Sequence, residues 1–137
     1  MEDVSTARIA SKWAVLLVAL VVSACDAAVE AHFRISTVGY DSTAEQSSQI
    51  AAALAARHDL RARTRSDCRL GNYEHSRDTR LLELCLEEEP QGVSVQLLEF
   101  IWGGSFHPDW SAKGDSLRRE LEDTLRTRFG DRLTKIH

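Results

Sequence analysis

A short apolar run near the N-terminus constrains this chain most, because it sets where the folded part begins. Residues 13–22 are apolar throughout, and the small residues Ser23 and Ala24 lead from them to Cys25. A bilayer-spanning helix needs about 20 apolar residues, whereas the core of a secretory signal has about 7 to 15. The run therefore predicts a signal segment, with the folded domain after it.

The tetrapeptide Val22-Ser23-Ala24-Cys25 resembles the lipobox of bacterial lipoproteins, in which an aliphatic residue and two small residues precede a cysteine. The resemblance covers only residues 1–25 and indicates a processing class, not a fold family. It implies that residues 1–24 are cleaved as a signal peptide and that Cys25 carries acyl chains such as palmitate. Residues 25–31 would then tether a domain formed by residues 32–137. An ordinary secretory signal or an uncleaved anchor is the alternative.

The same resemblance implies a location in the bacterial cell envelope, lipid-anchored and facing the periplasm. Asp26 directly follows the cysteine and resembles an inner-membrane retention signal, but sorting to the outer membrane stays an equal alternative. The membrane, reached through lipid on Cys25, is the first partner that the sequence implies.

The size and net charge of the processed chain limit the classes of function that it can have. Removing residues 1–24 from the 137 residues leaves 113, enough for one compact domain. The formal net charge stays at −4, because the removed segment holds two acidic and two basic residues. A nucleic-acid-binding domain is expected to be clearly basic. We therefore expect an envelope protein as the further partner and no nucleic acid.

Two cysteines remain after Cys25 is assigned to lipid. In an oxidising compartment, an even pair is more often a disulfide than a metal or redox site, which predicts a bridge between Cys68 and Cys85. Their spacing fits no zinc motif, and the histidines are scattered along the chain. The sequence therefore predicts no metal and no cofactor.

Hydrophobic periodicity predicts an α+β domain with the order β-α-β-β-β-α. Alternating or strongly apolar patterns predict four strands, and helical patterns follow Ser42 and begin again near Asp115 or Ser116, the second ending at Gly130. The expected architecture is a two-layer sandwich, with both helices on one face of a four-stranded, mostly antiparallel sheet. The four predicted strands are 32–38, 60–70, 81–87 and 93–102.

Four arginines alternate along the predicted strand 60–70 and would share its solvated face. Such a row fits acidic partners such as lipid headgroups, phosphates or an anionic protein surface. The interpretation we favour is that the arginines pair with Glu83 and Glu87 of the neighbouring strand. Strict alternation also turns Cys68 inward and Cys85 outward, so the predicted disulfide requires a bulge near Cys68 or a strand that ends before it. The row consists of Arg61, Arg63, Arg65 and Arg69.

An aromatic segment between glycine and the last helix is the best candidate for a partner-binding loop. It contains Trp102, Phe106, His107 and Trp110. Aromatic side chains bury a large area at low entropic cost, which makes them good interaction anchors. The alternative, slightly favoured, is that Trp102 and Phe106 close the end of the core while Trp110 lies over the last helix.

Catalytic patterns are weak. The chain has no GxSxG, HExxH, P-loop or dinucleotide fingerprint, and its nearby His–Asp pairs are of the kind expected by chance. We therefore predict no catalytic residues and a small non-catalytic binding or assembly module of the envelope. One alternative is an immunity-type lipoprotein that neutralises a periplasmic toxin. Another is a minor envelope hydrolase that uses His107 and Asp109.

Overall fold

The fold comes from a computed structural model that describes residues 26–103 and 109–137. The lipobox-like tetrapeptide, Phe106 and His107 lie outside the described residues. The predictions made for them, cleavage, acylation and partner binding, stay predictions.

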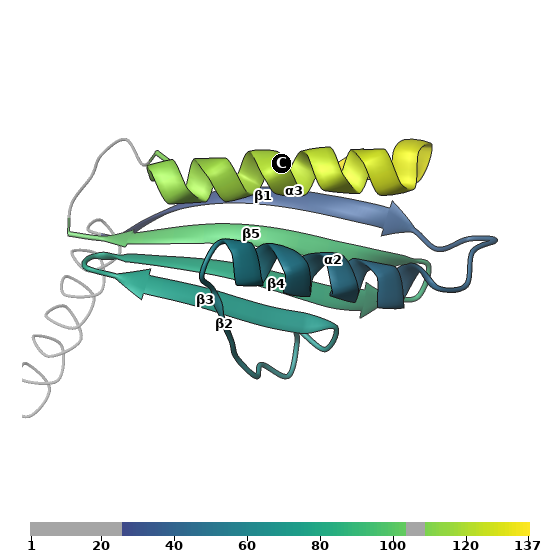
Figure 1. The fold of residues 1–137 in the computed structure, drawn as a ribbon, viewed down its shortest axis with the longest axis horizontal. Coiled ribbons are helices and arrows are strands. Elements are labelled where there is room, and N and C mark those ends of the chain that lie inside the picture. The colour runs from purple at the N-terminus through teal and green to yellow at the C-terminus, as the bar shows by residue number, and fades with distance from the viewer. Residues whose placement is uncertain (1–25, 104–108) are drawn as a thin grey trace, which may run out of the picture.

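The described residues form two layers, an antiparallel sheet of six strands and two α-helices (Figure 1). The strand order is β2-β3-β4-β5-β1-β6. Both helices lie over the same face of the sheet (Figure 1). The strands are β1 (Asp26–Ser36), β2 (Arg61–Ala62), β3 (Gly71–Arg77), β4 (Arg80–Glu89), β5 (Gly92–Trp102) and β6 (Leu133–Lys135). The helices are α2 (Thr43–Arg57) and α3 (Ala112–Phe129), and the short 3-10 turn η1 (Gly130–Arg132) joins α3 to β6.

A single core fills the space between the sheet and the helices. Alternate residues of β1, β4 and β5 point toward the helices, and Leu82, Leu84 and Leu86 are buried as their alternation predicted. The alanines of α2 that face the sheet, Ala51 and Ala55, are buried too, which lets that helix lie close to the strands. The largest apolar side chains with almost no exposure are Phe33, Ile35, Leu54, Leu84, Leu86, Val93, Val95, Leu97, Leu117, Leu121 and Leu125.

The predicted four-stranded sheet is wrong, because the sheet has six strands. Only Arg61–Ala62 of the predicted strand 60–70 is a strand, and the polar stretch that was expected to connect it onward forms β3. β3 consists mostly of polar residues, since much of it faces away from the core. Its sequence therefore lacks the hydrophobic alternation by which a strand is predicted. β6 is only three residues long and directly follows η1. Three residues are too few to show a recognisable hydrophobic alternation.

The first strand also begins earlier than predicted. Residues 26–31, expected to be a tether, form the first half of β1, and its first residue, Asp26, is the register partner of Trp102 on β5. This half is rich in alanine, a residue depleted in strands, so local propensity gives little strand signal. Pairing with β5 along the whole length of β1 supplies the missing order.

The last helix begins at Ala112, a few residues before the predicted start. Ser111 is the N-cap, and its side chain accepts a hydrogen bond from the Gly114 backbone N–H at 3.0 Å. Gly114 looked like a loop residue in the sequence, but it is helical and buried. A Cβ there would lie 2.8 Å from Glu99 Oε1, so glycine is needed for the close approach of α3 to β5.

Candidate functional site

The sheet face opposite the helices carries the disulfide, and we call it the open face. Cys68 and Cys85 are bonded at an S–S distance of 1.99 Å, which confirms the predicted pairing. β2 ends at Ala62, well before Cys68, so the alternation that turned Cys68 inward does not reach it. Of the two solutions weighed from the sequence, an early end of the strand is the one found. The bridge holds residues 63–70, the flap, against β4.

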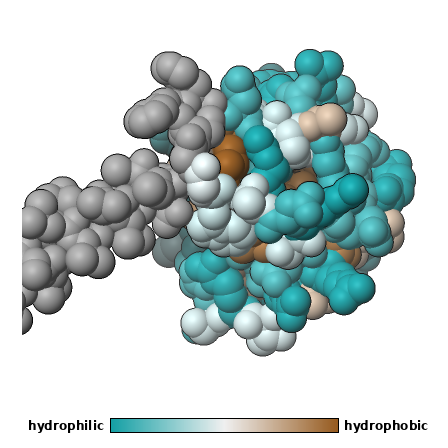
Figure 2. Space-filling model, turned by 90° about the vertical axis from the view of Figure 1, so that its left-hand side faces the viewer, coloured by the Kyte–Doolittle hydropathy of each residue, from teal (hydrophilic) through white to brown (hydrophobic). Residues whose placement is uncertain are grey.

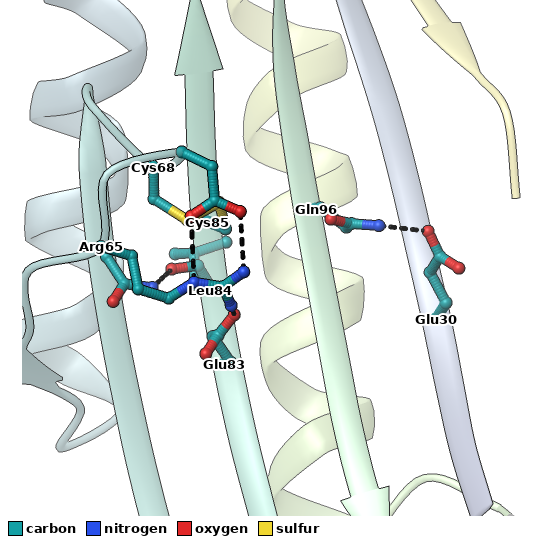
Figure 3. A network of polar contacts seen from close by, with 9 residues as sticks. Glu30, Arg65, Cys68, Glu83, Leu84, Cys85 and Gln96 are labelled. Carbon is teal, nitrogen blue, oxygen red and sulfur yellow. Dashed lines mark hydrogen bonds and ion pairs between the residues drawn. A yellow bond between two sulfur atoms is a disulfide. The ribbon is translucent and has the colours of Figure 1, made fainter.

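The flap covers an acidic residue on β4. The Glu83 side chain is only 6% exposed, and it receives Arg65 Nη1 at 2.5 Å (Figure 3). Arg65 also donates from Nη2 to Asp67 at 2.7 Å, and this hydrogen bond lowers the pKa of the Asp67 carboxyl below its ordinary value. The flap half of the open face is thus closed by a disulfide and a small ion-pair network.

The four arginines do not form a row on one strand. Arg61 lies on β2, while the other three belong to the flap. Arg63 pairs with Glu74 of β3 at 2.6 Å and Arg65 pairs with Glu83 of β4. The favoured pairing with Glu83 is therefore found for Arg65 alone, whereas Arg63 pairs with Glu74 and neither of these flap arginines pairs with Glu87. Arg69 is exposed.

The other half of the open face carries large apolar side chains that the described residues leave partly exposed, with Glu30 beside them. Leu81 of β4 and Ala28 of β1 flank Phe100 of β5 as its register partners, and Leu98 and Trp102 lie on the same side of β5. Phe100 is 36% exposed and Trp102 is 42% exposed. We call these five residues the Trp102 patch. It lies at the end of the sheet where β1 begins and β5 ends, the left-hand end in Figure 1.

Figure 2 looks at that end of the molecule. Brown and near-white surface lies beside the grey atoms there, within a surface that is otherwise mostly teal. Apolar surface is thus exposed at the end of the domain where β1 begins.

A polar pocket of about 520 Å³ opens on the helix-covered side of the same end. At its base lies Glu99, which is 2% exposed although charged. Glu99 accepts hydrogen bonds from the Ser111 backbone N–H at 2.6 Å and from the Ser111 hydroxyl at 2.5 Å, and Arg80 lies 3.3 Å away. The carboxylate thus joins β5 to the start of α3. We call this cavity the Glu99 pocket.

The walls of the Glu99 pocket carry both signs of charge. His75, Arg77, Arg80 and Lys113 line it together with Asp59 and Asp78. Both aspartates have positive φ, 59° for Asp59 and 54° for Asp78. Ordinary turns explain these angles, because Asp59 directly follows the C-cap of α2 and Asp78 lies in the β3–β4 hairpin. Such a lining suits a ligand group that is itself charged.

The hydrogen bonds of His58 and His75 go to groups other than the side chains of the nearby aspartates, and His107 lies outside the described residues. His58 Nε2 lies 2.5 Å from Glu120 of α3, and His75 Nδ1 lies 3.1 Å from the backbone oxygen of Asp59. Asp109 is exposed, and its backbone oxygen accepts a hydrogen bond from Arg80 at 3.1 Å. These arrangements position α2, α3 and the hairpin.

The two described tryptophans of the aromatic segment lie on different sides of the sheet. Trp102 belongs to the open face, whereas Trp110 is half-buried against the core beside Gly114. The structure therefore does not bring them together into one anchor. Sequence reasoning missed Glu99 and Arg80, although one signal was available: Glu99 is a charged residue at an inward position of an otherwise apolar strand.

Residues 26–103 and 109–137 contain neither a helix that could span a membrane nor a cluster of metal ligands. Neither α2 nor α3 is apolar enough to cross a membrane. Within those ranges, no three histidine, cysteine or acidic side chains gather as a metal site would require.

No family model matches the chain, and no curated protein or solved structure is detectably similar to it.

Proposed function

We propose that this chain is a lipid-anchored domain of the bacterial cell envelope that acts as a non-catalytic binding or assembly module. The observation that carries the proposal is the position of β1, which begins at Asp26, the residue directly after Cys25. A lipid on Cys25 would therefore attach to the sheet itself, without a flexible linker.

Such an attachment fixes which end of the domain lies near the membrane. Consecutive Cα atoms are about 3.8 Å apart, so an acylated Cys25 would lie within one residue of the Asp26–Trp102 register pair. Each buried methylene of an acyl chain contributes about 0.8 kcal/mol, and two or more chains anchor a protein stably. The end that holds the Glu99 pocket would then face the membrane.

The disulfide supports the same compartment. Disulfides persist in oxidising compartments, including the bacterial periplasm, and are rare in the cytosol. The Cys68–Cys85 bridge uses the two cysteines that remain beside Cys25. In this proposal each cysteine of the chain therefore has a role, one in lipid attachment and two in closing the flap.

The Glu99 pocket is the proposed binding site of the module. Its volume of about 520 Å³ falls within the range of small-ligand pockets, about 300–1,000 Å³. Its mixed charges suit a polar group with ionic character, from a small molecule or from an envelope protein. Glu99 itself is held by Ser111 and Arg80, so its role in the pocket is to position these neighbours.

The proposal is tested by labelling bacteria that express the chain with radioactive palmitate, followed by fractionation. We expect label on the chain in the membrane fraction, and no label on a Cys25→Ser variant produced at the same level. A Cys68→Ala, Cys85→Ala variant is the matched control, since it loses two cysteines but keeps Cys25 and the label. Absence of label on the unaltered chain would overturn the proposal.

A further inference from the structure

We propose that the Trp102 patch rests in the interfacial layer of the membrane to which Cys25 is anchored. The inference builds on the proposed function and adds which surface of the domain meets the lipid. The partner is a lipid surface, recognised by aromatic and aliphatic side chains and not by a specific headgroup.

The composition of the patch fits this environment. Its large side chains are Leu81, Leu98, Phe100 and Trp102, presented side by side by two neighbouring strands. Tryptophan is enriched at membrane–water interfaces, where its amphipathic ring sits at headgroup level, and leucine and phenylalanine accompany it on interfacial surfaces. Phe100 and Trp102 remain 36% and 42% exposed in the domain, so burial in lipid would remove further apolar surface from water.

The position of the patch is set by the chain that precedes β1. Asp26 pairs with Trp102, and Ala28 pairs with Phe100, so the patch begins opposite the residue that is covalently bonded to Cys25. Neighbouring strands are about 4.8 Å apart, which places an acyl chain on Cys25 within reach of the same bilayer surface as the two aromatic rings. From Asp26, the residue bonded to Cys25, residues 26–36 form one continuous strand, so the described part of the chain has no break between the patch and Asp26.

Charged residues of the open face lie at both ends of the sheet. Arg34, Glu87 and Glu89 lie toward the opposite end of β1 and β4, far from Asp26 along the strands. Arg34 Nε and Glu89 are paired there at 3.1 Å. The large apolar side chains of the open face thus lie beside the anchor, next to the acidic residues Asp26 and Glu30, and the Arg34–Glu89 ion pair lies at the far end.

The test uses the mature acylated protein in vesicles that contain brominated phospholipids, which quench tryptophan fluorescence by contact. After loss of residues 1–24 the chain has two tryptophans, and Trp110→Phe leaves Trp102 alone. The matched control is the triple variant Trp102→Phe, Trp110→Phe, Tyr40→Trp. It carries one tryptophan at the far end of the sheet, at a position that is 56% exposed. We expect the brominated lipids to quench Trp102 several-fold more strongly than the far-end tryptophan.

The outcomes separate the inference from the proposed function. Intact mass, measured on the same samples, reports whether Cys25 is acylated; an unmodified Cys25 overturns the proposed function and the inference together. An acylated protein with equal quenching at the two ends overturns the inference alone. An acylated protein that dimerises with Trp102 shielded from both lipid and water also overturns it, because a second copy then covers the patch.

Discussion

The two halves of the open face differ in how far their side chains are exposed to water. On the flap half, residues 63–70 are bonded to β4 through Cys68 and cover Glu83, whose side chain is 6% exposed. On the other half, the Trp102 patch leaves Phe100 and Trp102 more than a third exposed. One half is thus closed by the chain itself, and the other keeps its apolar surface uncovered by the described residues.

The difference indicates which half is the better candidate for an interaction surface. Large contiguous apolar patches are rare on monomeric proteins and commonly mark sites that bind proteins or membranes. The flap half needs no partner, because its buried carboxylate already has Arg65. Residues 26–103 and 109–137 leave the patch half uncovered, and in the proposed function a lipid surface covers it.

The largest expected effect separates the two faces of one strand. Leu97 is 0% exposed and faces the helices, so Leu97→Ala should lower the free energy of unfolding by about 2–5 kcal/mol. Leu98 is the next residue and belongs to the patch, so Leu98→Ala should cost only about 1 kcal/mol or less. Urea unfolding followed by circular dichroism measures both. Equal losses would mean that the patch is part of the folding core.

Removing the disulfide should weaken the flap half alone. A bridge that closes a loop of 17 residues stabilises by about 3 kcal/mol in the chain-entropy model, so the variant Cys68→Ala, Cys85→Ala should lose about that much. Urea unfolding gives the loss, and the quenching of Trp102 by brominated lipids should stay unchanged. A change in quenching as large as the change in stability would contradict the independence of the two halves.

A smaller effect is expected from the ion pair beneath the flap. Arg65→Ala removes the partner of a buried carboxylate, but the Arg65 side chain is 49% exposed, so water can reach Glu83 once it is gone. We expect a loss of about 1 kcal/mol, well below the cost of breaking a fully buried pair. Arg61→Ala, on the exposed strand β2, is the matched control and should change thermal stability little. Similar losses in both variants would show that Glu83 does not depend on Arg65.

The smallest expected effect is a pH dependence of the flap. The hydrogen bond from Arg65 lowers the pKa of Asp67 in the folded protein, so this contact stabilises the fold above the ordinary aspartate pKa of about 3.9. The contribution is lost as the pH falls through the lowered value. We therefore compare the unfolding midpoints of the unaltered chain and of Asp67→Asn between pH 2 and 7. The midpoints should differ slightly at neutral pH and coincide in strong acid. A difference that persists in strong acid would assign the effect to another group.

The sequence predicted the parts of the fold that local patterns determine. Leu82, Leu84 and Leu86 alternate in a strand with one apolar face, and Gly130 ends α3 with a φ of 55°. Both cysteines of the bridge were found because an even pair in an oxidising compartment has few other uses. These predictions depend on residues that are close in the sequence and on the cell compartment that was expected for the chain.

The sequence could not predict what long-range pairing decides. The regular alternation of residues 60–70 is that of a strand, yet the disulfide to β4 and the turns around Cys68 hold most of it as a flap. Residues 26–31 carry weak strand propensity and are ordered by β5 instead. The Glu99 pocket was missed because its lining comes from segments as far apart in the chain as Asp59 and Lys113.

The most direct test of the central claim is the intact mass of the protein from bacterial membranes, measured before and after reduction. The account predicts loss of residues 1–24, added acyl mass on Cys25, and a gain of about two daltons on reduction of the Cys68–Cys85 bridge. A chain that keeps Met1, carries no acyl mass and gains nothing on reduction would contradict it.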